Sequence, residues 1–258
     1  MDIWQAALHL YPTETPLMRY TPSLIQGTLI KRYKRFLADI ELASGEVITA
    51  HCPNTGSMKN CCDPGSRVWV YDANNPKRKL RYTWELVEVE SRYLACINTG
   101  RANHLVKEAI LAGDIPELAH YETLKTECKY GQENSRIDIL LSADGKPDCY
   151  VEVKNVTLLE ENNLGSFPDA VTTRGTKHLR ELMEMKSQGA RAVLFFNVAH
   201  TGISAVTPNR CIDPIYTDTL EEAINHGVEV LAYGADISDT HIHINNPIPF
   251  SMNKTIDH

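Results

Sequence analysis

The spacing of apolar and polar residues divides the chain into two regions with different secondary structure. From residue 24 to about residue 90, short runs rich in Val, Tyr, Trp and Thr predict β-strands. Loops full of Asn, Pro and Gly separate these runs, and Ser44-Gly45 marks a turn. The predicted strands cover residues 27–33, 35–42, 46–52, 67–71 and 82–89. Five short strands in about 70 residues predict a small barrel, for which the OB type is the best candidate.

From residue 98 onward the spacing becomes helical. Apolar residues three or four apart predict a helix that begins after Asn98 or Thr99 and stops at Gly113. The strands predicted in this region cover residues 123–130, 136–141, 150–156, 192–198 and 228–233, and the two further helices cover residues 172–188 and 214–226. Asp144-Gly145 marks a tight turn between the second and third of these strands. The order helix, three strands, helix, strand, helix, strand predicts an α/β domain.

These patterns predict two domains, for which a chain of 258 residues is long enough. We expect an all-β OB-type barrel over residues 21–95 and an α/β domain over residues 96–235. Residues 1–20 would be an N-terminal extension, and residues 236–258 a C-terminal strand and tail.

Composition indicates an ordinary globular protein, with 43% hydrophobic and 23% charged residues. No apolar run approaches the ~20 residues that a membrane helix needs, and the N-terminus is a poor signal peptide. The seven cysteines include no CxxC pair, which is typical of reduced thiols. We therefore expect a cytoplasmic protein that does not enter a membrane. The sequence leaves its oligomeric state open.

The distribution of charge favours a nucleic-acid partner, although the net charge of −7 does not. Residues 1–95 hold 12 Lys and Arg against 10 Asp and Glu, so the acidic excess lies in the rest of the chain. Two clusters without acidic residues form the predicted DNA-binding surface of the barrel: Lys31, Arg32, Lys34 and Arg35, and Lys77, Arg78, Lys79 and Arg81. The alternative is a set of solvated side chains on the barrel surface.

Three residues of the predicted central hairpin form a candidate catalytic site. Glu152 and Lys154 alternate with Val151 and Val153, so they share one face of their strand. A hairpin about the Asp144-Gly145 turn can bring Asp138 beside Glu152. Two converging carboxylates predict a site for Mg²⁺ or Mn²⁺, held by Asp138 and Glu152. The ammonium of Lys154 would orient or deprotonate an attacking water.

This arrangement resembles the PD-(D/E)XK nuclease superfamily, in which Asp and Glu-x-Lys stand on a helix, three strands, helix, strand frame. The resemblance implies a restriction-endonuclease-like fold for the C-terminal domain. Ile137 stands where the motif has proline. The alternative interpretation is a salt bridge between Lys154 and a carboxylate on a half-exposed sheet.

The start of the helix at residues 172–188 is also basic. Arg174, Lys177 and His178 are predicted to face a DNA phosphate, and the alternative is that they are ordinary solvated positions. His178 could assist proton transfer, but a hydrogen-bonding role is more common. Related nucleases often use an acidic residue on the first helix as a third ligand. The sequence leaves that ligand open between Glu108 and Asn103.

Other potential sites are weaker. His51, Cys52, Cys61 and Cys62 lack the paired spacing of a structural zinc site, and His241 with His243 offers only two ligands. The aromatic residues near the basic clusters could stack on bases or fill the barrel, and the core is favoured for the tryptophans. These residues are Trp69, Tyr71, Tyr82 and Trp84.

Several long segments resemble the sugar fermentation stimulation protein family (SfsA). They are LIQGTLIKRYKRFLAD at 24–39, HCPNTGSM at 51–58, NPKRKL at 75–80, VEVKNVT at 151–157 and FPDAVT at 167–172. The resemblance runs from about residue 20 to 235 and implies an OB-type domain, a nuclease-fold domain and non-specific DNA binding. It also implies regulation of sugar metabolism, notably of maltose. Asp138, Glu152 and Lys154 match the presumed nuclease site. Residues 1–17 fall outside the match, so they are an extension or reflect an upstream start.

From the sequence we therefore expect a DNA-binding protein with a Mg²⁺-dependent nuclease site. A non-catalytic DNA-binding regulator that retains the nuclease fold is the first alternative. RNA processing is the second, because an OB barrel serves RNA as readily as DNA.

Overall fold

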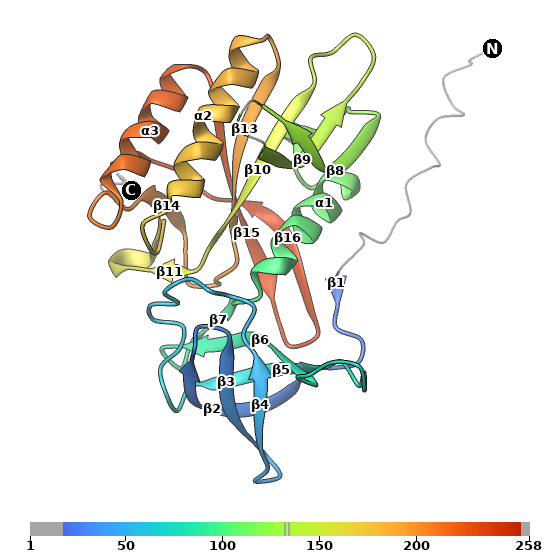
Figure 1. The fold of residues 1–258 in the computed structure, drawn as a ribbon, viewed down its shortest axis with the longest axis vertical. Helices are drawn as coiled ribbons and strands as arrows, with labels where there is room; N and C mark the ends of the chain where they lie inside the picture. Colours follow the sequence, from blue (N-terminus) through green and yellow to red (C-terminus); the bar gives the residue numbers. More distant parts are fainter. Residues whose placement is uncertain (1–17, 132, 134, 254–258) are drawn as a thin grey trace, which may run out of the picture.

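The computed structural model describes residues 18–131, 133 and 135–253, and the first 17 residues lie outside this part. Residues 25–89 form the barrel expected from the sequence (Figure 1). Its strands are β2 (Ile25–Tyr33), β3 (Leu37–Leu42), β4 (Val47–His51), β5 (Arg67–Asp72) and β6 (Tyr82–Val89). Four antiparallel pairings and one parallel pairing, between β4 and β6, close the barrel. This is the strand order of an OB barrel. A further strand, β7 (Tyr93–Cys96), pairs antiparallel with β6.

Trp84 and Trp69 are both buried, Trp84 inside the barrel and Trp69 in the hydrophobic cluster that the barrel shares with α1. Trp84 is fully buried and donates a hydrogen bond to the Leu86 backbone oxygen at 2.8 Å, while Trp69 is 8% exposed. Tyr71 and Tyr82 are only half-buried. The prediction that the tryptophans belong to the core is therefore confirmed.

The C-terminal domain is built on a seven-stranded sheet with the order β1-β16-β15-β13-β10-β9-β8. The strands are β1 (Met18–Arg19), β8 (Thr123–Tyr130), β9 (Ser135–Ser142), β10 (Cys149–Val156), β13 (Arg191–Val198), β15 (Glu229–Ile237) and β16 (His241–Pro247). The central pairs β10–β13 and β13–β15 are parallel, as the apolar composition of β13 indicates. Since β1 pairs with β16, two segments from the ends of the described chain complete this sheet.

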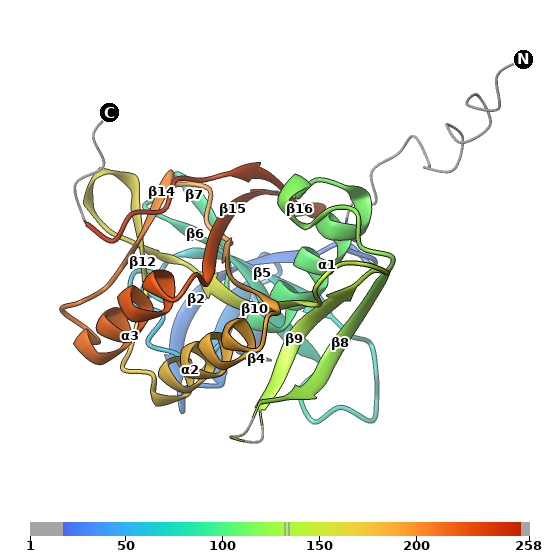
Figure 2. The same cartoon turned by 90° about the horizontal axis from the view of Figure 1, so that it is seen from above.

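Helices cover both faces of the sheet (Figure 2). On one face α1 (Ala102–Ala112) packs Leu105 and Val106 against Val151 and Phe195. The other face is covered by α2 (Thr173–Ser187) and α3 (Pro214–Asn225). The described residues also include the short 3-10 helices η2 (Thr99–Arg101), η3 (Pro116–Leu118) and η4 (Glu161–Asn163). None of the helices in the described ranges is long and apolar enough to span a membrane.

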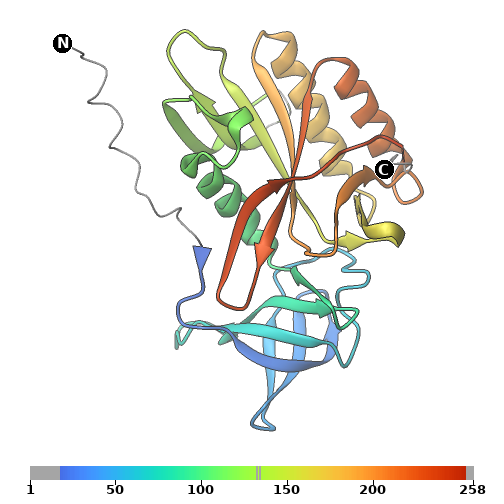
Figure 3. The ribbon, with the colours of Figure 1, turned by 180° about the vertical axis from the view of Figure 1, so that it is seen from behind.

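A three-stranded sheet beside the large one was not expected from the sequence. It consists of β11 (Leu158–Leu159), β12 (Leu164–Phe167) and β14 (Ala205–Pro208). Its strands have two to four residues, which is too short for a periodic pattern to be recognised. It lies between the barrel and α3 (Figure 3).

The two domains share a hydrophobic core and several polar contacts. Trp69 and Leu86 of the barrel belong to the same buried cluster as Leu105 and Val106 of α1. Across the interface, the Asp169 Oδ2 atom accepts hydrogen bonds from the Ser57 hydroxyl at 3.0 Å and the Met58 backbone at 3.3 Å. The loop after β4 is therefore fixed against the α/β domain.

Candidate active site

The strands of the central hairpin separate at the predicted catalytic residues. Strand β9 pairs with β10 from Cys149↔Leu141 to Val151↔Ile139, and the ladder ends there. Continued by one residue, this register would place Asp138 opposite Glu152. Instead, the Asp138 Oδ2 atom accepts a hydrogen bond from the Val153 backbone N–H at 2.8 Å. A side-chain carboxylate thus replaces the strand as acceptor, as Asp commonly does where regular pairing stops.

Asp138 is held from the helical layer as well. Its Oδ1 atom accepts a hydrogen bond from the Asn103 amide of α1 at 2.8 Å. Burial, and the nearby negative charge of Glu152, raise the pKa of Asp138. Of the two residues considered as a third ligand, Asn103 lies at the site. Burial raises the pKa of Glu108, and the nearby residues His243 and His104 act in the opposite direction.

Glu152 is 1% exposed and is held through one of its two oxygens. Its Oε1 atom accepts a hydrogen bond from the Lys154 Nζ atom at 2.5 Å and also contacts the His178 Nδ1 atom. Its Oε2 atom is buried and has no hydrogen-bond partner among the described residues. Burial alone would raise the pKa of Glu152, but the charge of Lys154 and the contact with His178 hold it below its ordinary value. The carboxylate therefore stays ionised with one oxygen unpaired.

His178 is a buried member of this cluster and also lines the basic hollow beside it. It is 5% exposed and lies with its Nδ1 atom 3.4 Å from the Lys154 Nζ atom. On its other side the Arg174 Nε atom is 3.4 Å from its Nε2 atom. These contacts give His178 hydrogen-bonding partners, and its assistance in proton transfer stays a prediction. Its partner, Glu152, could not be identified because the two residues lie 26 positions apart.

Asp138, Glu152, Lys154 and His178 are brought together, but a larger ligand set is not. In the ranges that the structure describes, no group of three or more His, Cys, Asp or Glu side chains could hold a metal ion. The residues considered for zinc have other environments: Cys52 and Cys61 are buried in the barrel core, and His243 contacts Asp114 at 2.8 Å.

A basic hollow of about 500 Å³ adjoins the His178 side of the cluster. Its walls include Arg174 and Lys177, which the sequence singled out, and Lys129 and Arg136, which it did not. Glu127 also lines it, so its cations outnumber its acidic residue. Lys129 and Arg136 lie opposite each other in the β8–β9 pairing and therefore share a face. That cross-strand register was the signal that could have identified them.

The basic residues of the barrel divide into exposed and engaged side chains. Lys34 and Arg35 are exposed in the β2–β3 turn, and Lys77 and Lys79 in the β5–β6 loop. Arg78 of the same loop is exposed but donates a hydrogen bond to the Thr83 hydroxyl at 2.9 Å. Lys31 lies 3.5 Å from Asp39, and Arg81 forms two hydrogen bonds to Asp72. Arg32 donates to the backbone oxygens of Asn54, Gly56, Ser57 and Arg35. Arg32 thus fastens the loop after β4, which leaves its guanidinium little capacity for a phosphate.

Comparison with known proteins gives a consistent result for both domains. Residues 30–97 match a family model described as the SfsA N-terminal OB domain, and residues 100–241 match the sugar fermentation stimulation protein RE domain. A sugar fermentation stimulation protein homolog of Marinomonas sp. (strain MWYL1) is 56% identical over 243 residues, which cover 94% of each chain. A homolog from Shewanella frigidimarina is 59% identical over 86% of this chain and 94% of its own.

A solved structure resembles the whole fold. It is described as Pyrococcus furiosus SfsA in complex with Ca²⁺, and it is 26% identical in sequence. The match has a TM-score of 0.81 and covers 92% of this chain and 100% of the other. Together with the family models, this match confirms an N-terminal OB barrel followed by a restriction-endonuclease-like α/β domain.

Proposed function

Because the chain belongs to the sugar fermentation stimulation protein family, with both of its domains, we propose that it binds DNA without sequence specificity and hydrolyses phosphodiester bonds. The catalytic site is formed by Asp138, Glu152 and Lys154, with Mg²⁺ or Mn²⁺ held by the two carboxylates. The observation that carries this proposal is the state of Glu152. A buried, ionised carboxylate with an unpaired oxygen is costly unless a further partner binds it.

The donor set fits a hard divalent cation. Carboxylate oxygens are the ligands that Mg²⁺ and Mn²⁺ prefer, and Mg²⁺ commonly binds only one or two carboxylates together with water and substrate phosphate. Asp138 and Glu152 meet this requirement without a third carboxylate. The Ca²⁺ named for the Pyrococcus furiosus relative supports a divalent cation in this family.

Each side chain of the site has its own role in the proposed reaction. When bound, the metal ion would neutralise charge that develops on the attacked phosphate. Lys154 orients the attacking water with its ammonium, while Glu152 and His178 hold that ammonium in place. Asn103 and the Val153 backbone fix the carboxylate of Asp138.

DNA binding is supported by two basic surfaces. The exposed residues of the barrel lie in the loops between its first and second and its fourth and fifth strands, which are the loops that OB barrels use for oligonucleotides. The basic hollow adds Lys129, Arg136, Arg174 and Lys177 near the catalytic cluster. Contacts to phosphate give affinity without sequence specificity.

A non-catalytic DNA-binding regulator of sugar metabolism is the second candidate. One observation favours it: the described residues supply only two carboxylates here, and Lys154 is paired with one of them. Such a pair could serve only to neutralise charge inside a retained nuclease fold.

The decisive experiment compares wild type with Glu152→Gln. Wild type is incubated with Mg²⁺ or Mn²⁺ on single-stranded, duplex and branched DNA and on RNA, with chelator controls. We expect Glu152→Gln to lose cleavage by about 100-fold or more, because removing one electrostatic contributor costs this much at other sites. Its DNA affinity should stay nearly unchanged, because the basic surfaces remain intact. Glu161→Gln, the same change at an exposed residue, is the matched control and should cleave normally.

The alternative outcomes are equally informative. Cleavage that persists in Glu152→Gln would place the activity elsewhere or in a contaminant. A wild type that binds DNA but cleaves no substrate would favour the regulator. Cleavage of RNA alone would favour RNA processing.

A further inference from the structure

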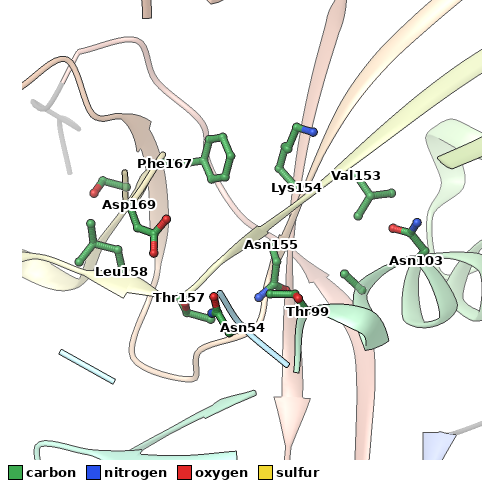
Figure 4. A pocket seen from close by; sticks show the side chains of 12 residues that line it. Asn54, Thr99, Asn103, Val153, Lys154, Asn155, Thr157, Leu158, Phe167 and Asp169 are labelled. Atoms are coloured by element: carbon green, nitrogen blue, oxygen red, sulfur yellow. The ribbon is translucent and has the colours of Figure 1, made fainter. Parts of the chain in front are cut away.

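A second, smaller hollow of about 230 Å³ lies between the two domains, next to Lys154 (Figure 4). Asn54 reaches it from the loop after β4 of the barrel, and Thr99 from η2. Asn155, Thr157 and Phe167 enter from the α/β domain. A group bound here would therefore touch both domains and the proposed catalytic lysine.

The polar groups around this pocket include both donors and acceptors with spare capacity. The Asn155 Oδ1 atom accepts from the Asn197 amide at 2.7 Å, which leaves the Asn155 amide nitrogen as a donor. The Asn54 Oδ1 atom accepts from the Gly56 backbone at 2.8 Å, which likewise leaves its amide nitrogen. Asn103 donates to Asp138, so its oxygen remains as an acceptor. No hydrogen bond within the described residues engages these remaining atoms.

Phe167 gives the pocket an aromatic wall. Its ring centroid lies 5.3 Å from that of Tyr216 and 5.7 Å from that of Phe196. These neighbours fix the ring in place. A fixed aromatic ring is a platform on which a planar group can stack at little entropic cost.

The pocket is far less basic than the hollow on the other side of the cluster. Among its lining residues only Lys154 and Asp169 carry charge, whereas the basic hollow has Lys129, Arg136, Arg174 and Lys177. Cationic walls suit phosphates, while neutral amides and hydroxyls pair with the edges of bases. The two hollows therefore suit different parts of a nucleotide.

We propose that this pocket receives one unpaired nucleobase of the DNA strand, beside the phosphodiester bond that faces Lys154. The inference rests on the proposed function, because it identifies the substrate class of the same site. A base inside a duplex is stacked and has its pairing edge occupied, so it must first be unstacked and unpaired to enter such a pocket, whereas an unpaired base does not bear this cost. The substrate is accordingly single-stranded DNA, or duplex DNA with an unpaired nucleotide at an end or junction.

Binding without cleavage tests this proposal. The full chain is titrated in Ca²⁺ and, separately, in chelator with single-stranded oligonucleotides that carry one 2-aminopurine, and with the matching blunt duplexes. We expect tighter binding of the single strand and a fluorescence change at one position of the label. Asn155→Ala and the isosteric Thr157→Val should each weaken single-strand binding about tenfold, as lost base contacts do elsewhere. Their binding to blunt duplex should change little.

Asn197→Ala is the matched control. It removes the same Asn155–Asn197 hydrogen bond but keeps the Asn155 amide in the pocket. Equal losses in Asn155→Ala and Asn197→Ala, with none in Thr157→Val, would overturn the base pocket. Equal losses on single strand and duplex would overturn it too. Circular dichroism of each variant separates misfolding from lost contacts.

The outcomes also separate this proposal from the nuclease proposal. If the wild type cleaves blunt duplex and the pocket variants bind DNA normally, the nuclease proposal stands and the base-pocket proposal is wrong. If the wild type binds single strands through the pocket but cleaves no substrate, the base-pocket proposal stands and the nuclease proposal is wrong. The same losses on RNA with no binding of DNA would overturn DNA as the ligand.

Discussion

His200 shows how the fold treats a titratable side chain outside the candidate site. It is 2% exposed, and its Nδ1 atom accepts a hydrogen bond from the Gly202 backbone at 3.0 Å. The proton of the neutral ring is therefore on the Nε2 atom, which is buried without a partner among the described residues. Burial lowers the pKa of His200 to about 4. The ring stays neutral at pH values where an unfolded chain would protonate it.

This difference predicts a pH-dependent stability. Between the unfolded pKa of about 6.5 and the folded pKa, the unfolded chain binds a proton that the folded chain does not, so stability falls as the pH is lowered. From pH 7.5 to pH 5, His200 should account for a loss of about 2 kcal/mol. His200→Asn keeps an acceptor for Gly202 and removes this contribution, as urea unfolding at both pH values would measure. His104→Asn, an exposed control on α1, should retain the wild-type pH dependence.

At the scale of elements, the β2–β3 turn and the β5–β6 loop carry the exposed cations of the barrel. Both lie at the ends of short strands whose alternating residues build the interior. Lys34 and Arg35 occupy the turn with positive φ values of 49° and 65°. Their side chains donate no hydrogen bond to another described residue. Arg32, only two residues away, is engaged with the loop after β4. The first basic cluster therefore both holds the loop after β4, through Arg32, and presents free cations to solvent, through Lys34 and Arg35.

This division predicts the effect of charge reversal in the turn. Lys34→Glu with Arg35→Glu should weaken DNA binding to a similar degree for all sequences. It should also reduce the slope of log affinity against log salt by about 1 to 2, since fewer counterions are released. Binding measured at several salt concentrations provides the test, with Lys146→Glu in the distant β9–β10 turn as a single charge-reversal control. An unchanged slope would show that the barrel is not the docking surface.

At the scale of the whole molecule, a buried ion pair helps to join the domains. Glu85 of β6 is 1% exposed and accepts two hydrogen bonds from Arg101 of η2, at 2.9 and 3.1 Å. Asn98 donates a third to the same carboxylate at 2.9 Å. The pair lies where the chain passes from the barrel into the α/β domain. Docking of the two domains therefore depends on the Arg101 guanidinium, which compensates the buried charge of Glu85.

Removing Arg101 should destabilise the protein by about 3 kcal/mol or more, because it leaves the buried Glu85 without its counter-charge. The change is Arg101→Met, measured by urea unfolding. The pair Glu85→Gln with Arg101→Met should recover much of this loss, since no charge is then buried alone. Arg81→Met removes an exposed arginine paired with Asp72 and should cost far less than Arg101→Met. Similar costs for Arg101→Met and Arg81→Met would contradict this account.

Local pattern was sufficient to predict most of the elements and part of the site. Burial of one face imposes a period of two on strands and of about 3.6 on helices, so the main strands and helices of both domains could be recognised. The same alternation placed Glu152 and Lys154 on one face. The Asp144-Gly145 turn indicated a hairpin whose register points Asp138 towards Glu152.

The remaining features depend on contacts between distant segments. The contact of His178 with Glu152 and the hydrogen bonds by which Arg32 holds the loop after β4 each require a specific long-range packing. The pocket beside Lys154 exists only because the loop after β4 docks against the α/β domain. The sequence by itself determined which residues face a core and which chemical groups are present. Tertiary structure decided which of those groups meet, because hydrogen bonds and charges act over a few ångströms between residues that periodicity cannot pair.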